Sequence, residues 1–488
     1  MVVQKIASIA SFSPCSHGTT PKGNSDGGIN TSVALCVFVL LVAVLLLKPT
    51  NANALPVGWT GGISSHSQVY IDSMSPQRIE LSYREAARSD ARYIRVDVNM
   101  NSIFHLQGEQ PPEVERGQQI VGFYGGRAIY ANWQKIDLLR FIDAKYEQMG
   151  RPVKTLGIFL LTPRFLSTKP SAPNYYLYAP RDPQVWANLA AAIVRRQPQL
   201  FDAVEIWNEP DGDWVWKSTP EEYARMLMYS YWTIKGVNKE LPVLNGGWMS
   251  VGSADFLRRA ARELRGNQVY DAINVHIRPE RAGLTVPKMR NWRDKLAKYG
   301  FVGAKKLPLW VTEYGYPSGP AFCQDKGYQG ERGQALFLYR ELLAGLRAEP
   351  NAEFFVTLRD STPTEANLCQ QQEGIVNMAP DSSSLAVREK PGLFAVVAAQ
   401  NQFQAERIAL LARYVQRRYR IDLAALRKKE GDLAAQAVGL KPKSPRQRRR
   451  ARLRAEERLL LSLLQQKRKK EARARQALLR AGIYTRRR

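Results

Sequence analysis

Short apolar runs alternate with amphipathic stretches between residues 55 and 404, and this pattern predicts strands that alternate with helices. The stretches expected as strands read, in chain order, "ARYIRVDV", "KTLGIFLL", "AVEIW", "LPVLNGG", "AINVHI", "LPLWVTE" and "EFFVTLR", and an earlier strand is expected within "VGWTGGISSH". Strands and helices that alternate about eight times favour parallel pairing through crossover helices. The pattern therefore predicts an α/β fold, a (β/α)8 TIM barrel, for residues 55 to 404.

Two of the predicted helices have clear starting signals. Asp182 can cap a helix that begins with Pro183, a position where proline fits because no backbone N–H donor is needed there. Thr219, followed by Pro220 and Glu222, has the spacing of a capping box. These signals place one helix after the third predicted strand of the barrel and another after the fourth.

The N-terminal segment has the pattern of a targeting sequence. Residues 33 to 47 form one uncharged apolar run, which is followed by Lys48 and by "NANA" ending at Ala54. A short apolar core before a small-x-small site predicts a secretory signal that is cleaved after Ala54. The run is shorter than the ~20 residues of a typical membrane-spanning helix, but an uncleaved signal anchor stays open as the alternative. Residues 1 to 54 therefore predict a secreted or cell-envelope protein.

The cysteines fit an oxidising compartment. Cys15 and Cys36 lie in the leader, so Cys323 and Cys369 remain as an even pair that is expected to form a disulfide bond. Two free buried thiols are the alternative. The chain has no CxxC motif and only four histidines, so we expect neither a metal nor another cofactor.

The formal net charge of +27 is concentrated near the C-terminus. Residues 405 to 488 contain 27 Lys and Arg against 7 Asp and Glu, a net charge of +20, whereas residues 1 to 404 contain 44 against 37, a net charge of +7. We therefore expect residues 405 to 488 to form a basic, partly helical C-terminal tail, hinged near residues 439 to 445. On an exported protein such a tail would bind an anionic envelope polymer or a membrane surface, and a nucleic-acid partner is not expected. A solvated tail without a partner is the alternative.

Two of the predicted strands end in glutamate, Glu209 in "EIWNE" and Glu313 in "LWVTE". In a (β/α)8 barrel, residues at the C-terminal ends of the strands form the active site. The two glutamates are about three strand–helix units apart, so they should face each other across the barrel mouth. Glycoside hydrolysis requires such a pair, because one carboxyl group protonates the leaving oxygen while the other attacks the anomeric carbon or activates water. Two structural salt-bridge partners are the alternative.

The segments around these glutamates resemble clan A of the glycoside hydrolases. "WNEP" after one strand and "VTEYG" three units later match the two catalytic motifs of the clan. "RYIRVDV", "WQKIDLLRFIDA", "LTPRF", "VLNGG" and "KPGLFAVVAA" look closest to sequences of family thirty-nine and family five. The resemblance covers most of residues 60 to 400. It implies a (β/α)8 retaining glycosidase with the acid/base on the fourth strand and the nucleophile on the seventh.

Residue by residue, the resemblance implies five site positions. Glu209 matches the acid/base and Glu313 the nucleophile. Asn208 matches the residue that hydrogen-bonds the sugar 2-hydroxyl. Arg95 matches an arginine that helps to keep the nucleophile ionised, because a neighbouring cation lowers the pKa of a carboxyl group. His276 matches a histidine on the sixth strand, and a core histidine is the alternative.

The sequence departs from the pattern of the clan at three places. "IR" follows His276 where relatives usually have a tyrosine that hydrogen-bonds the nucleophile. Phe165 stands where "TP" is often followed by tryptophan, and Arg359 stands where the last strand often ends in tryptophan. Arg278 together with Arg359 could bind the carboxylate of an acidic sugar, and a structural ion pair is the alternative.

Three aromatic residues, Trp214, Trp216 and Tyr316, lie in the loops after the two glutamates. Aromatic faces stack on the C–H faces of sugars, so these side chains are expected to line substrate subsites, unless they anchor the loops instead. The sequence thus favours an exported retaining glycoside hydrolase that acts on an oligo- or polysaccharide. A noncatalytic polysaccharide-binding or scaffold protein on the same barrel is the alternative.

Overall fold

The computed structural model describes residues 62–64, 75–88, 91, 93–249, 254–319, 324, 327–349, 352–357, 376–378, 387–421 and 445–483. The predicted leader lies outside these residues, as do Cys323, Cys369 and Arg359, so the disulfide bond remains a prediction. Among the described residues, no helix is both long enough and apolar enough to cross a bilayer.

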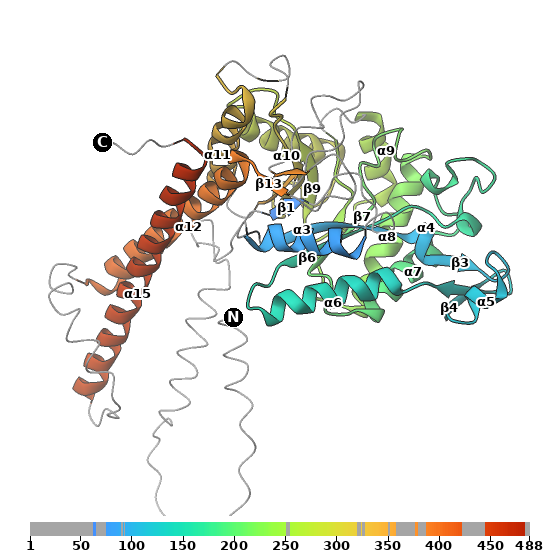
Figure 1. Cartoon of the computed structure of the whole chain (residues 1–488), viewed down its shortest axis with the longest axis horizontal. Helices are drawn as coiled ribbons and strands as arrows, with labels where there is room; N and C mark the ends of the chain where they lie inside the picture. Colours follow the sequence, from blue (N-terminus) through green and yellow to red (C-terminus); the bar gives the residue numbers. More distant parts are fainter. Residues whose placement is uncertain are drawn as a thin grey trace, which may run out of the picture. The chain divides into compact units, whose positions relative to one another are not determined.

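Eight parallel strands form the main sheet (Figure 1). In chain order they are β1 (Gly62–Ser64), β2 (Tyr93–Asn99), β6 (Lys154–Leu160), β7 (Ala203–Ile206), β8 (Val243–Asn245), β9 (Ile273–Ile277), β10 (Leu309–Tyr314) and β11 (Glu353–Thr357). Their order across the sheet is β8, β7, β6, β2, β1, β11, β10, β9, and each neighbouring pair is parallel. The predicted strands are all present, and the prediction of a parallel α/β fold is confirmed.

The sheet curves so strongly that side chains from distant strands meet in its interior. The rings of Tyr93 on β2 and Trp310 on β10 have centroids 5.3 Å apart, although β1 and β11 lie between these strands in the sheet. The edge strands β8 and β9 are joined by isolated parallel bridges, such as Leu244 with Ala272. A closed TIM barrel would have a continuous hydrogen-bonded ladder between these two strands, and the described residues show only isolated bridges there.

Helices follow the strands as the alternating pattern predicts. The longer ones are α3 (Pro76–Arg88), α6 (Gln134–Gln148), α7 (Pro183–Arg196), α8 (Pro220–Val237), α9 (Ala254–Leu264), α10 (Thr285–Tyr299) and α11 (Gly330–Ala348). Both predicted starts are confirmed. Asp182 accepts hydrogen bonds from the backbone N–H groups of Gln184 and Val185, and Thr219 and Glu222 form a complete capping box at the start of α8.

A small antiparallel sheet between β2 and α6 was not predicted. Its strands, β3 (Phe104–Leu106), β4 (Gln119–Tyr124) and β5 (Arg127–Ala131), have the order β3, β5, β4. A signal was available, because Gly125 and Gly126 stand between two apolar runs and have φ of 56° and 78°, as in a tight hairpin turn. The remaining short elements are α4 (Met100–Ile103), α5 (Pro112–Glu115), η2 (Arg164–Leu166), η3 (Tyr175–Leu177), β12 (Val376–Met378) and β13 (Val387–Glu389).

Helix α12 (Pro391–Tyr419) crosses the predicted domain boundary between residues 404 and 405 without interruption. It packs on α11, and its first half contributes Leu393 and Val396 to the main hydrophobic core. The boundary predicted between residues 404 and 405 therefore falls inside a packed helix. The boundary was drawn from the change in charge, but the apolar face of this helix continues past that change.

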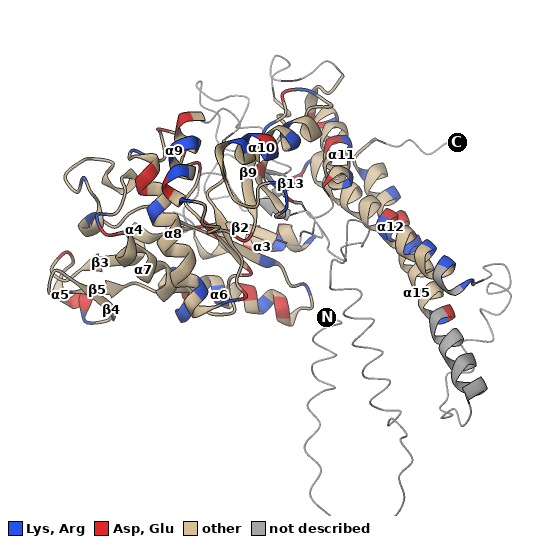
Figure 2. Ribbon diagram, turned by 180° about the vertical axis from the view of Figure 1, so that it is seen from behind, with Lys and Arg blue, Asp and Glu red and all other residues tan. Residues whose placement is uncertain are grey.

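Helix α15 (Pro445–Arg480) packs along α12 (Figure 1). Leu460 and Leu461 join Ala412 and Val415 of α12 in one apolar cluster. Ala481, directly after α15, is part of the main core. Leucines of α15 are thus used for packing. Figure 2 shows Lys and Arg, in blue, along both helices. The described part of the C-terminal region is a packed helical pair and not a solvated tail.

Candidate active site

Glu209 and Glu313 lie at the C-terminal ends of two strands of the main sheet. Glu209 comes shortly after β7, the fourth strand of the sheet in chain order, and Glu313 lies in β10, the seventh. One carboxylate oxygen of each glutamate and a ring nitrogen of His276 lie within 4.8 Å of one another. The side chain of Glu209 is 12% exposed and that of Glu313 is 3% exposed. The fold therefore brings the two predicted carboxylates together in a nearly buried site.

Arg95, on β2, connects this pair to the interior of the sheet. Its Nη1 donates to Glu313 Oε1 at 3.0 Å, and its Nη2 donates to Asn208 Oδ1 at 2.8 Å. Burial by itself disfavours the charge on Arg95, but the adjacent Glu205 and Glu313 outweigh it, so the pKa of Arg95 lies above its ordinary value. Arg95 is thus a permanent cation beside Glu313, and its bond to Asn208 orients that amide.

Sequence reasoning missed Glu205, the second carboxylate partner of Arg95. Its Oε2 accepts from Arg95 Nε at 2.9 Å, and its Oε1 accepts from Arg95 Nη2 and from the Gly247 N–H, each at 3.0 Å. Both side chains of this ion pair are fully buried. A signal was available, because a carboxylate in the middle of the apolar run "AVEIW" requires a buried cation or several donors.

Arg278, two residues after His276, contacts Glu313. Its Nη2 donates to Glu313 Oε2 at 3.0 Å, so each oxygen of Glu313 accepts from a different guanidinium group. The structural ion pair that the sequence left open is therefore present. Binding of an acidic sugar by Arg278 stays a prediction, and its expected companion Arg359 lies outside the described residues.

His276 links the two glutamates to a chain of hydrogen bonds. Its Nδ1 lies 2.8 Å from Glu209 Oε1 and 3.5 Å from Glu313 Oε2. Its Nε2 lies 3.2 Å from the Thr312 hydroxyl oxygen, and that hydroxyl donates to Asn274 Oδ1 at 2.7 Å. Since the hydroxyl proton is used toward Asn274, the hydroxyl oxygen accepts from His276, which assigns a proton to Nε2. Nδ1 is therefore the ring atom that shares a proton with Glu209.

Gly247, in "VLNGGW", leaves the space that the His276 ring occupies. A Cβ atom at Gly247 would lie 2.0 Å from His276 Nε2 and 2.3 Å from Cδ2. Real Cβ contacts are never this short, so any side chain at this position would displace the ring. The glycine is therefore required by the site and not by a turn.

The segment that carries Glu209 has an unusual backbone. Trp207 and Glu209 have φ of 71° and 44°, left-handed values that are costly for residues other than glycine and that recur at functional sites. Trp207 is held in place by packing, because its Nε1 donates to the Val215 carbonyl at 2.9 Å and its ring packs edge-on against Trp216 with centroids 4.9 Å apart. The loop thus fixes the position of Glu209.

Two of the three aromatic residues predicted to stack on sugars are inaccessible. Trp216 is 3% exposed and packs against Tyr223, and Tyr316 is 1% exposed and stacks on Phe337 with ring centroids 3.6 Å apart. Because a face packed against protein cannot stack on a sugar, these two assignments are wrong. Both side chains anchor loops to the helices. Trp214, which is 55% exposed, keeps its predicted role as a candidate platform.

Asp211, two residues after Glu209, provides a prediction about stability and pH. Burial raises the pKa of its carboxyl group from 3.8 to about 7, although the Met249 N–H donates to both of its oxygens. The native protein therefore keeps a proton that the unfolded chain releases near pH 4. This contribution to the free energy of unfolding is complete below pH 4 and is lost as the pH rises through about 7. The loss is at most roughly 4 kcal/mol.

Asp211→Asn is neutral at every pH and keeps an oxygen that can accept from Met249. We expect its free energy of unfolding to match that of the wild type near pH 4 and to exceed it at pH 8, as measured by urea unfolding at both values. Asp213→Asn is the matched control, because Asp213 is exposed in the same loop. A difference between Asp211→Asn and the wild type that does not change with pH would contradict this account.

Glu209, His276 and Glu313 are also residue types that bind metal ions, and their ligand atoms are close enough to share one. However, both oxygens of Glu313 accept from guanidinium groups. A dication at this position would lie beside two permanent positive charges, and their repulsion opposes its binding.

Comparisons with known proteins gave no matching family model and no matching curated protein. The solved structures to which the chain is similar include glycoside hydrolases. One is a family 39 glycoside hydrolase from Bacteroides cellulosilyticus WH2, with 17% identity and a TM-score of 0.47 over 70% of this chain and 63% of that chain. Another is a family 39 β-xylosidase from Caulobacter crescentus, with 20% identity and a TM-score of 0.47 over 72% and 73%. The chain thus spans less than two thirds of the first of these proteins.

Proposed function

We propose that the protein is an exported retaining glycoside hydrolase that cleaves O-glycosidic bonds of an oligo- or polysaccharide. The observation that carries this proposal is the unequal environment of two neighbouring carboxyl groups. Glu313 accepts from two guanidinium groups, whereas Glu209 has no Lys or Arg partner among the described residues and contacts His276. When the environments of two carboxyl groups push their pKa values apart, one group serves as the acid and the other is the ionised group.

In the first step of the proposed reaction, Glu209 donates its proton to the glycosidic oxygen while a Glu313 oxygen attacks the anomeric carbon. The carbon–oxygen bond of the glycoside breaks, the alcohol leaves, and a glycosyl ester forms on Glu313. In the second step, Glu209 removes a proton from water, the water attacks the anomeric carbon, and the ester bond breaks. Glu313 leaves as a carboxylate, and Glu209 is again protonated.

The separation of the carboxyl groups supports retention of configuration. Retaining enzymes hold the two groups about 5 to 5.5 Å apart, whereas inverting enzymes leave about 6.5 to 9.5 Å for a water molecule between group and sugar. Oxygens of Glu209 and Glu313 within 4.8 Å of each other suit direct attack. In the proposed reaction Asn208, which Arg95 orients, hydrogen-bonds the sugar, and exposed Trp214 of the same loop offers a ring face.

The alternative, a noncatalytic saccharide-binding protein, is favoured by one specific observation. Both oxygens of Glu313 accept hydrogen bonds from arginines, which lowers their nucleophilicity, so attack on the anomeric carbon becomes easier when one arginine withdraws. Arg278 is the partner that can withdraw, because its side chain is 32% exposed whereas Arg95 is completely buried. We therefore expect Arg278 to shift when a substrate enters.

The test of the proposed function is the stereochemistry of hydrolysis. The full chain is incubated with a panel of polysaccharides and small glycosides, and the anomeric configuration of the first product is followed by NMR. We expect release of sugar with retained configuration. Inverted product would contradict the double displacement, and saccharide binding without any product would favour the noncatalytic alternative. Export is tested separately, by locating the protein with and without residues 1 to 54.

A further inference from the structure

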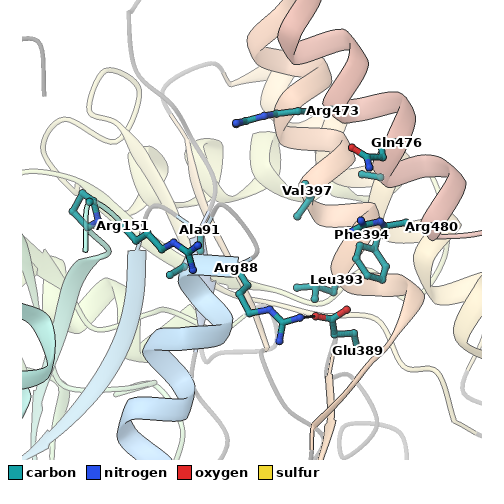
Figure 3. Close-up of a pocket in the computed structure, with 14 residues that line it drawn as sticks. Arg88, Ala91, Arg151, Glu389, Leu393, Phe394, Val397, Arg473, Gln476 and Arg480 are labelled. Atoms are coloured by element: carbon teal, nitrogen blue, oxygen red, sulfur yellow. Dashed lines mark ion pairs between the residues drawn. The ribbon is translucent and has the colours of Figure 1, made fainter. Parts of the chain in front are cut away.

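A cavity of about 640 Å³ lies away from the two glutamates. One wall is formed by the C-terminal end of α3 and by Gly150–Pro152, the loop between α6 and β6, and the other by α12 and α15 (Figure 3). Since α3 leads into β2 and this loop leads into β6, the first wall lies at the N-terminal ends of parallel strands. Glu209 and Glu313 lie at the opposite, C-terminal ends. The cavity is therefore separate from the candidate active site.

The cavity is lined by four arginines and one carboxylate, which gives a net charge of 4 − 1 = +3. Figure 3 shows Arg88 and Arg151 on one side and Arg473 and Arg480 on the other, so positive charge comes from both walls. The carboxylate is Glu389, and no other lining residue is acidic. Like charges that face each other across a gap repel, so an anion between them would stabilise this arrangement.

Some of the lining arginines do not form an ion pair with a carboxylate of the described residues. Arg88 is paired with Glu389 at 2.5 Å and with Glu85 at 3.4 Å. By contrast, Arg151 and Arg480 have no carboxylate partner among the described residues. Arg480 lies over the Phe394 ring, 5.6 Å from its centroid. This contact covers one face of the guanidinium and leaves its N–H edge for a ligand.

We propose that this cavity binds an oligophosphate group. Arginine donates in pairs to phosphate oxygens, and several arginines around one gap suit a group with several negative charges. A single carboxylate would leave most of the net charge uncompensated, whereas two or more phosphates match it. The volume lies within the range of about 300 to 1,000 Å³ that is typical of small-ligand sites. A bound phosphate would also connect α15 to the sheet, because its partners come from both walls.

The direct test is calorimetric titration of the full chain with tripolyphosphate. We expect saturable binding that weakens as salt is added. Arg151→Gln combined with Arg480→Gln should weaken it at least ~10-fold, because two charge-assisted hydrogen-bond donors are lost. The matched control combines Arg468→Gln with Arg475→Gln, which removes the same charge from exposed positions of α15 that do not line the cavity. This control should change the affinity less than ~2-fold.

The single variant Arg151→Gln is a second test in case the double variant misfolds. Arg151 is an exposed loop residue outside the helical packing, so this substitution should leave the fold intact. A second titration uses vesicles that contain phosphatidic acid, with phosphatidylcholine vesicles as the reference. Binding of both probes with the same dependence on Arg151 would support the proposal and indicate a site for phosphate groups in general. Vesicle binding without tripolyphosphate binding would overturn the oligophosphate in favour of a lipid headgroup. An equal loss in the cavity and control variants would overturn the proposal, since it would show a diffuse basic surface. Absence of binding to both probes would overturn it as well.

Discussion

Replacing Glu313 with alanine is expected to abolish turnover, by about 10⁴-fold or more, since the nucleophile that forms the glycosyl ester is removed. Binding of the saccharide should remain measurable, because Asn208 and Trp214 lie on a different loop and Arg95 keeps its ion pair with Glu205. The measurement is the initial rate on a small glycoside, together with the affinity for a nonhydrolysed oligosaccharide.

Glu313→Gln keeps the size of the side chain and one oxygen that can accept from Arg95. It therefore separates loss of the nucleophile from loss of the fold, because Glu313→Ala leaves the buried Arg95 with one carboxylate fewer. Both variants should be inactive, and the thermal unfolding of Glu313→Gln should stay closer to that of the wild type. Substantial activity in a folded Glu313→Gln protein would rule out Glu313 as the nucleophile.

Replacing Glu209 with alanine is expected to act selectively. Hydrolysis of glycosides with poor leaving groups should fall about 10²- to 10⁴-fold, because the proton donor is lost. Aryl glycosides with acidic leaving groups should still form the glycosyl ester, since they leave without protonation. The second step then lacks its base, so the ester should accumulate, and added azide should restore turnover by attacking without deprotonation.

The product of azide rescue should be a glycosyl azide with retained configuration, which NMR can identify. Asp213→Ala is the matched control, because Asp213 is an exposed carboxylate four residues farther along the same loop. It should behave as the wild type and should not respond to azide. If Glu209→Ala slowed all substrates equally and azide had no effect, Glu209 would not be the acid/base.

The strands and caps could be predicted because their determinants are local. Strands buried on both faces appear as apolar runs, and Asp182 and Thr219 cap helices through contacts within three residues. The C-terminal boundary was placed inside a helix because the charge of the sequence changes near residue 405, whereas the packing of α12 continues past it. Whether α12 ends there depends on contacts with α11 and α15, and these contacts are not visible in composition.

In the candidate site, too, some residues could be predicted from the sequence and others could not. Glu209 and Glu313 could be found because they lie at the ends of recognisable strands, and the structure brings their oxygens together. The roles of Trp216 and Tyr316 could not be judged from sequence, since an aromatic ring in a loop can face solvent or pack on a helix. Arg278 shows the same limit, because its contact with Glu313 is set by the geometry of two neighbouring strands.

The presence of Ala481 in the main core has a consequence for biosynthesis. The same core begins with Ile79 among the described residues, so its contacts span almost the whole folded chain. While the ribosome is still adding α15, the apolar surfaces that α12 will cover with it are exposed. Domains generally fold as units during synthesis, and this one lacks part of its core until α15 and Ala481 have emerged. We therefore expect the nascent chain to remain incompletely folded until then, a state in which chaperones can bind it.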